Sequence, residues 1–111
     1  MAWIVELADE FEHEFAGMHN EVRDEICALS RLLQRFGPGL SRPRVDTLNG
    51  SRFANMKELR FSAAGGEWRV AFALDPKRKA ILLVAGDRSG VSERRFYTGL
   101  IHRRIAVLTR I

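Results

Sequence analysis

With 111 residues, 46% of them hydrophobic and 29% charged, the chain is long enough for one folded domain, and its composition excludes a disordered polypeptide. Residues 1–34 carry eight acidic and two basic side chains, a balance of −6, whereas residues 35–111 carry sixteen basic and six acidic ones, a balance of +10; together they give the net charge of +4. So basic a segment predicts a partner rich in phosphate groups.

The single cysteine, Cys27, excludes an internal disulfide, and we expect it to be a small buried side chain within a helix. No spacing of cysteine and histidine suggests zinc, and no apolar run approaches the length of a membrane span. The start of the chain does not resemble a signal peptide, because acidic residues follow Ile4 almost at once. We therefore expect a cytoplasmic protein that needs no metal or cofactor.

The N-terminal third of the chain predicts a strand and two helices. Residues 2–7 are mostly apolar, as in a buried strand. The first helix is expected to start at Asp9, because Glu12 completes a capping-box pattern, and Asn20 is the predicted N-cap of the second helix. Apolar residues recur at helical spacing in both helices until Gly37 and Pro38: Phe11, Phe15, Met18, Val22, Ile26, Leu29, Leu33 and Phe36.

The remainder predicts a long basic loop at residues 38–54, then three strands and a helix capped by Ser92. The strands are joined by short turn sequences, which favours an antiparallel meander: residues 55–62, 67–74 and 79–85. The third strand is apolar without alternation, so we expect it to be central and covered on both faces. The predicted fold class is α+β, a single domain over residues 1–111 whose small twisted antiparallel sheet (β-α-α-β-β-β-α) is backed by helices.

Side-chain alternation along the first two meander strands predicts a cluster of charged residues. Glu58 and Arg60 share one face of the first strand, and Arg69 lies on the matching face of the second strand. Ala71 and Ala73 follow on that face, and we expect them to leave open space above the sheet. A carboxylate beside two guanidinium groups indicates either a solvated ion-pair network or a catalytic site.

The order of these elements, together with three segments, resembles the RelE/ParE toxin superfamily and most of all its phage-derived HigB-like branch. The segments are MKELRF at residues 56–61, WRVAF at 68–72 and ILLVAGD at 81–87. The resemblance spans essentially the whole chain and implies a RelE-like fold. It also implies the toxin of a type II toxin–antitoxin pair, a ribosome-dependent mRNA endoribonuclease that inhibits translation. The implied partners are a helix-turn-helix, HigA-like antitoxin, the ribosome and mRNA.

Ribonucleases of this family need no metal, because the ribose 2′-hydroxyl group of the RNA is the nucleophile. A base takes its proton, cations stabilise the charge that develops on the phosphate, and an acid protonates the leaving 5′-oxygen. The resemblance makes Glu58 the candidate base and Arg69, with Arg60 beside it, the candidate cations. RelE-like members carry lysines at the positions of Met56 and Glu58, so the departure at these positions argues against a lysine base here.

Candidates for the general acid are Tyr97 and Asp87, with Arg88 and His102 as alternatives that spacing alone does not separate. Candidates for RNA binding are the basic side chains of the long loop, the sheet and the last helix: Lys57, Arg42, Arg44, Arg52, Arg88, Arg94 and Arg95. The superfamily also contains ParE-like proteins that inhibit DNA gyrase without cutting RNA, which is the first alternative. The second is an inactive relative that retains antitoxin binding. The predicted approach of Glu58 to Arg69 favours the nuclease.

Overall fold

The computed structural model describes residues 2–48 and 56–108, without the side chains of residues 93 and 103–108. Its elements follow in the order β1 (Ile4–Leu7), α1 (Asp9–Ala16), α2 (Asn20–Phe36), the short 3-10 helix η1 (Gly37–Gly39), β2 (Val45–Thr47), β3 (Met56–Ala63), β4 (Gly66–Asp75), β5 (Lys79–Asp87) and α3 (Glu93–Leu108). The predicted α+β class and the predicted order of helices and strands are confirmed, and β2 and η1 are additions to them.

Five strands form one mixed sheet in the spatial order β1-β5-β4-β3-β2. The predicted meander is confirmed, because β3, β4 and β5 pair as antiparallel neighbours. The expectation of a purely antiparallel sheet is wrong for β1, which pairs with β5 in parallel. Parallel neighbours need a long crossover connection, and here α1, α2 and the meander provide the intervening chain.

The first strand lies at the edge of the sheet and is not buried as predicted. Exposed and half-buried residues alternate along β1, and 53% of the surface of Ile4 is exposed. Glu6 points to the open side, where its Oε1 atom lies 3.2 Å from Lys79 Nζ. A charged residue in the middle of a four-residue apolar run is typical of such an edge position.

The long basic loop contains a strand that the sequence analysis did not predict. β2 pairs with β3 so that Val45 lies opposite Leu59 and Asp46 lies opposite Glu58. The Arg60 amide also donates to the Arg44 carbonyl at 2.8 Å, which extends this pairing by one residue. Only three residues are involved, too few for alternation to be distinguished from loop sequence.

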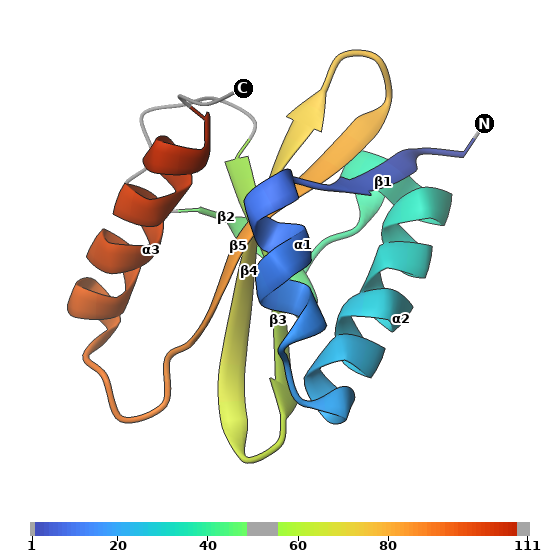
Figure 1. Cartoon of the computed structure of the whole chain (residues 1–111). Helices are drawn as coiled ribbons and strands as arrows, with labels where there is room; N and C mark the ends of the chain where they lie inside the picture. The colour runs from blue at the N-terminus through green and yellow to red at the C-terminus, as the bar shows by residue number, and fades with distance from the viewer. Residues whose placement is uncertain (1, 49–55, 109–111) are drawn as a thin grey trace.

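The helices cover both faces of the sheet, with α1 and α2 on one side and α3 on the other (Figure 1). The apolar stripe predicted for α2 is buried at Val22, Ile26, Leu29 and Leu33, but Phe36, which was also predicted to belong to it, is exposed. The prediction that β5 is covered on both faces is confirmed, because its residues 82–85 are all buried. No helix in the described part of the chain is both long and apolar enough to cross a membrane.

Two predicted helix starts differ in detail from the structure. α1 begins at Asp9, but its N-cap residue is Ala8, whose methyl group accepts no hydrogen bond. α2 is capped by His19, one residue before the predicted Asn20. The Nδ1 atom of His19 accepts a hydrogen bond of 3.1 Å from the Glu21 amide. The third start is confirmed, since Ser92 Oγ accepts from the Arg95 amide at 3.3 Å.

Cys27 is exposed, so the prediction of a buried cysteine is wrong. It follows Ile26, which lies on the buried stripe of α2, and a step of one residue turns the side chain by about 100° around a helix. The side chain therefore lies beside the buried stripe and not on it.

Candidate functional site

The charged cluster predicted on the sheet lies where strand pairing requires it. Arg60 on β3 lies directly opposite Arg69 on β4, and Glu58 lies opposite Ala71. On the other side of β3, Asp46 of β2 lies opposite Glu58. Helix α3 adds Tyr97, whose Oη atom donates a hydrogen bond of 2.9 Å to Glu58 Oε1. We refer to Asp46, Glu58, Arg60, Arg69 and Tyr97 as the Glu58 cluster.

A close approach between α3 and the sheet places Tyr97 over Glu58. A Cβ atom at Gly86 of β5 would lie only 2.9 Å from Phe96 Cε1, so the absence of a side chain at Gly86 lets the aromatic ring pack directly on the strand. Leu100, one turn further along the helix, is also buried. The residue after Phe96 is then directed along the sheet toward β3 and reaches Glu58.

Glu58 is a buried carboxylate, with only 3% of its surface exposed. Burial raises the pKa of Glu58 above its usual value, although the Tyr97 hydrogen bond and the charges of Arg69 and Arg60 oppose the rise. Its second oxygen, Oε2, has no hydrogen-bond partner among the described residues. A carboxylate with a raised pKa and one free oxygen has the properties of a general base.

The two arginines of the cluster differ in their freedom. Arg69 is 4% exposed, and its Nη1 atom donates to the Trp68 carbonyl at 2.8 Å. Arg60 is half-buried, with Nε 3.9 Å from Glu58 Oε1 and Nη1 3.6 Å from Asp46 Oδ2. Glu58 and Arg69 are both buried, so these two members of the cluster are not solvated as the ion-pair alternative supposed.

The open space expected above the sheet is only partly present. Ala71 is fully buried and Ala73 is half-buried, so this part of the face is covered. Beside the arginines, however, lies a hollow of about 230 Å³ whose lining residues are Pro43, Arg60, Phe61, Ser62, Glu67 and Arg69. An anionic ligand in this hollow would meet the guanidinium groups of both arginines.

The two leading candidates for the general acid occupy different places. Tyr97 contacts Glu58, and its pKa is raised by burial first and by the adjacent carboxylate second, so the phenol keeps its proton at neutral pH. Asp87 lies at the end of β5, where its Oδ1 atom accepts from the amides of Glu67 at 3.0 Å and Ser89 at 2.9 Å. These bonds, the one from Ser89 foremost, lower the pKa of Asp87, so it is ionised at neutral pH. The alternative His102 is exposed on α3.

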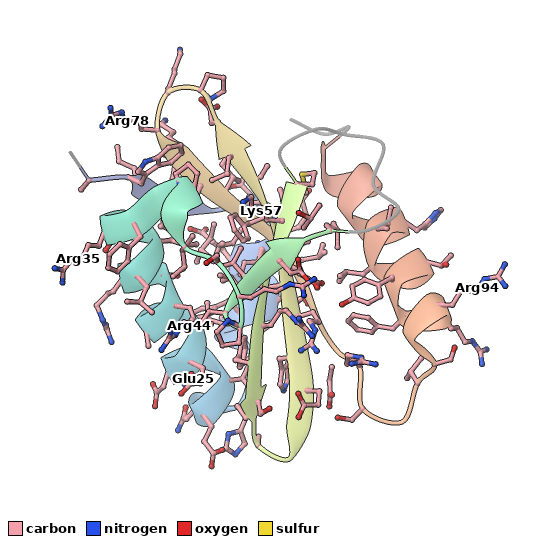
Figure 2. The ribbon with its side chains drawn as sticks, turned by 180° about the vertical axis from the view of Figure 1, so that it is seen from behind. Glu25, Arg35, Arg44, Lys57, Arg78 and Arg94 are labelled. Atoms are coloured by element: carbon pink, nitrogen blue, oxygen red, sulfur yellow. The ribbon has the colours of Figure 1, made fainter. Side chains whose placement is uncertain are left out.

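The candidates for RNA binding are spread over three parts of the molecule. Arg42 and Arg44 are exposed beside β2, and Arg94 and Arg95 are exposed on α3. Figure 2 shows Arg94 extending outward from α3, on the opposite side of the molecule from the labelled residues of α2. Half-buried positions hold the other two described candidates, Lys57 and Arg88. Arg52 lies outside the described residues.

Sequence reasoning missed Asp46, because the strand that carries it was assigned to a loop. The signal available was the sequence Val45-Asp46-Thr47, in which two β-branched residues flank the acid after Pro43. No group of three or more metal-binding side chains occurs within residues 2–48 and 56–108. The Glu58 cluster itself offers two carboxylates, a phenol and two guanidinium groups.

Comparison with known proteins places the chain in a family. Residues 13–103 match the model of the family described as phage derived protein Gp49-like (DUF891). The chain belongs to this family. It is also similar to the putative toxin HigB3 of Mycobacterium tuberculosis, with 43% identity over 84 residues, which are 76% of this chain and 72% of HigB3.

A second relative is the putative toxin HigB2 of the same organism, 45% identical over 75 residues. That match covers 67% of this chain and 37% of HigB2, so it spans only about a third of that relative's length. A structure of an E. coli toxin RelE mutant in the free state superposes with a TM-score of 0.67 over 95% of this chain and 99% of the other, at 12% identity. The RelE-like fold and the resemblance to the HigB-like branch are confirmed.

Proposed function

We propose that this Gp49-like protein is the toxin of a type II toxin–antitoxin pair and acts as a ribosome-dependent endoribonuclease that cuts mRNA and so inhibits translation. The single observation that carries the proposal is the Glu58 carboxylate, buried with a free Oε2 atom beside Arg69 and Arg60. The similarity of the chain to HigB2 and HigB3, both described as putative toxins, supports the same function.

In the proposed reaction Glu58 accepts the proton of a ribose 2′-hydroxyl group, and the ribose oxygen forms a bond to the adjacent phosphorus. The bond from phosphorus to the 5′-oxygen then breaks, which leaves a 2′,3′-cyclic phosphate and a 5′-hydroxyl end. Arg69 and Arg60, which line the hollow, stabilise the charge that gathers on the phosphate oxygens. Tyr97 still carries its proton at neutral pH, and we assign it the protonation of the leaving oxygen.

The expected partners follow from charge and from the family. The exposed arginines beside β2 and on α3 are suited to ribosomal RNA, because each arginine that neutralises a phosphate releases a condensed counterion. A toxin of this family requires an antitoxin, and we expect a helix-turn-helix, HigA-like protein. Its place of action is the cytoplasm, where translating ribosomes are found.

Cleavage is tested by primer extension on mRNA in a translating bacterial extract. We expect the parent protein to produce new 5′ ends, and Arg69→Ala to lower the rate by about 10²–10³, the usual cost of one preorganised charge-stabilising donor. Arg69→Lys should recover only part of this loss, because an ammonium group lacks the planar fork of arginine. Glu58→Gln should also be severely slowed at every pH, because an amide does not accept the proton.

Arg78→Ala is the matched control, since it makes the same chemical change in the turn between β4 and β5, at the far end from the Glu58 cluster (Figure 2). It should cleave at the parent rate. Growth unaffected by well-expressed folded protein would contradict the toxin function. DNA breaks and lost supercoiling activity without mRNA cleavage would indicate a gyrase inhibitor of the ParE type instead.

A further inference from the structure

Asp46 lies beside the proposed base, Glu58, but has no role in the proposed reaction. It lies opposite Glu58 in the pairing of β2 with β3. Its Oδ1 atom accepts from the Thr47 amide at 2.8 Å, which fixes the carboxyl group. The hydrogen bond to Arg42, 2.9 Å from Oδ2, is the largest of the interactions that lower the pKa of Asp46. Asp46 is therefore a fixed negative charge at neutral pH.

Arg60 is shared between two carboxylates and fully paired with neither. Its Nη1 atom is 3.6 Å from Asp46 Oδ2, and its Nε atom is 3.9 Å from Glu58 Oε1. Both separations exceed the roughly 2.7–2.9 Å of a charge-assisted hydrogen bond. Arg60 Nε is also buried without a hydrogen-bond partner among the residues described. The guanidinium group is thus drawn in two directions, by acids on neighbouring strands.

We propose that Asp46 is a positioning residue: it holds the Arg60 guanidinium group away from a full ion pair with Glu58, which leaves the arginine available to a phosphate and the carboxylate available to a proton. This inference rests on the ribonuclease function proposed above. When Asp46 loses its charge, the attraction that remains on Arg60 is that of Glu58, and the two close to a direct ion pair. A carboxylate in such a pair is a weaker base.

The groups that face Glu58 from each neighbouring element set the direction of the expected change. Burial and the negative charge of Asp46 raise the pKa of Glu58, whereas the hydrogen bond from Tyr97 and the charges of Arg69 and Arg60 lower it. Removing the charge of Asp46 takes away a raising influence and brings Arg60 nearer. Both effects lower the pKa of Glu58, so the direction of the shift is unambiguous.

The test is Asp46→Asn, which keeps an oxygen atom for the Thr47 amide, followed by NMR titration of the Glu58 side-chain carboxyl group. We expect the titration midpoint to move to lower pH, and the acidic limb of the cleavage rate to move with it. The turnover number at neutral pH should fall by about 10-fold, a part of the 10²–10⁴ that general-base catalysis supplies. Asp75→Asn at the far end of β4, six residues or about 20 Å from Arg69, is the matched control and should change neither.

The same titration in an Arg60→Ala background shows whether Asp46 acts through Arg60, because coupled residues give non-additive effects. We expect most of the shift to vanish there. An unchanged midpoint in Asp46→Asn, or an equal shift with and without Arg60, overturns the proposal. Asp46→Ser is the second variant if circular dichroism shows that Asp46→Asn does not fold. A shifted midpoint in a protein that cuts no RNA would contradict the ribonuclease function alone.

Discussion

Replacing Tyr97 with phenylalanine removes one hydroxyl group and, with it, the 2.9 Å hydrogen bond donated to Glu58 Oε1. Hydrogen bonds to charged groups contribute about 1.5–3 kcal/mol to stability. Glu58 is almost entirely buried, so water does not replace the lost donor. At about 4 °C per kcal/mol for a domain of this size, the melting temperature of Tyr97→Phe should fall by about 6–12 °C where Glu58 is ionised.

The loss should depend on pH in a direction that the structure determines. Burial already raises the pKa of Glu58 in the folded parent, and the hydrogen bond from Tyr97 lowers it. Losing that hydrogen bond in Tyr97→Phe therefore raises the pKa of Glu58 further. Below the folded pKa of the parent, Glu58 is protonated in both proteins and the ionic part of the difference is absent. The difference grows as pH rises between the two folded pKa values and is constant above both.

Thermal unfolding of the two proteins, followed by circular dichroism from pH 4 to pH 9, measures this difference. Glu58→Gln is the control background, because an amide carries no charge and the cost of Tyr97→Phe should then be smaller and independent of pH. Equal melting temperatures for parent and Tyr97→Phe at pH 8, or a cost that is the same at both ends of the range, would refute this account of Glu58.

Tyr97 is the sole tyrosine, so phenolate absorbance reports on this residue alone. Its phenol should ionise above the ordinary pKa of 10.0, and ionisation at 10.0 would contradict its burial. Arg94→Ala and Arg95→Ala should each lower the salt dependence of ribosome binding, by about one unit of slope per lost phosphate contact, and an unchanged slope would exclude that contact. Gly86→Ala should lower the melting temperature and the cleavage rate by pushing Phe96 away, and equal stability would contradict the close packing.

Much of the site was predictable because antiparallel hairpins with short turns leave little freedom in register. Alternation put Glu58, Arg60 and Arg69 on one face, and the pairing of β3 with β4 brings them together. A short turn joins β3 to β4, so the turn residues in the sequence were enough to predict how the two strands align. The contact between Tyr97 and Glu58 joins positions 39 residues apart and depends on how α3 packs, which no local pattern contains.

The incorrect predictions share a physical cause, which is that the environment of a short segment is set by its neighbours in space. β1 reads as a buried strand from its composition, yet it lies at the sheet edge because its only sheet neighbour among the described strands is β5. Asp46 was missed because a three-residue strand exists only when a longer strand, here β3, offers a free edge. Cys27 is small and apolar like the buried residues of α2, but its side chain does not lie on the buried stripe that holds Ile26.

Helix α3 follows every strand in chain order, so a ribosome that synthesises this protein adds Glu58 and Arg69 before it adds Tyr97. In a nascent chain that stops short of α3, Glu58 lacks the hydrogen bond that Tyr97 donates to it in the complete fold. For the ribonuclease proposed above, the contact between the proposed acid and the proposed base is thus complete only after the last helix has been made and has docked.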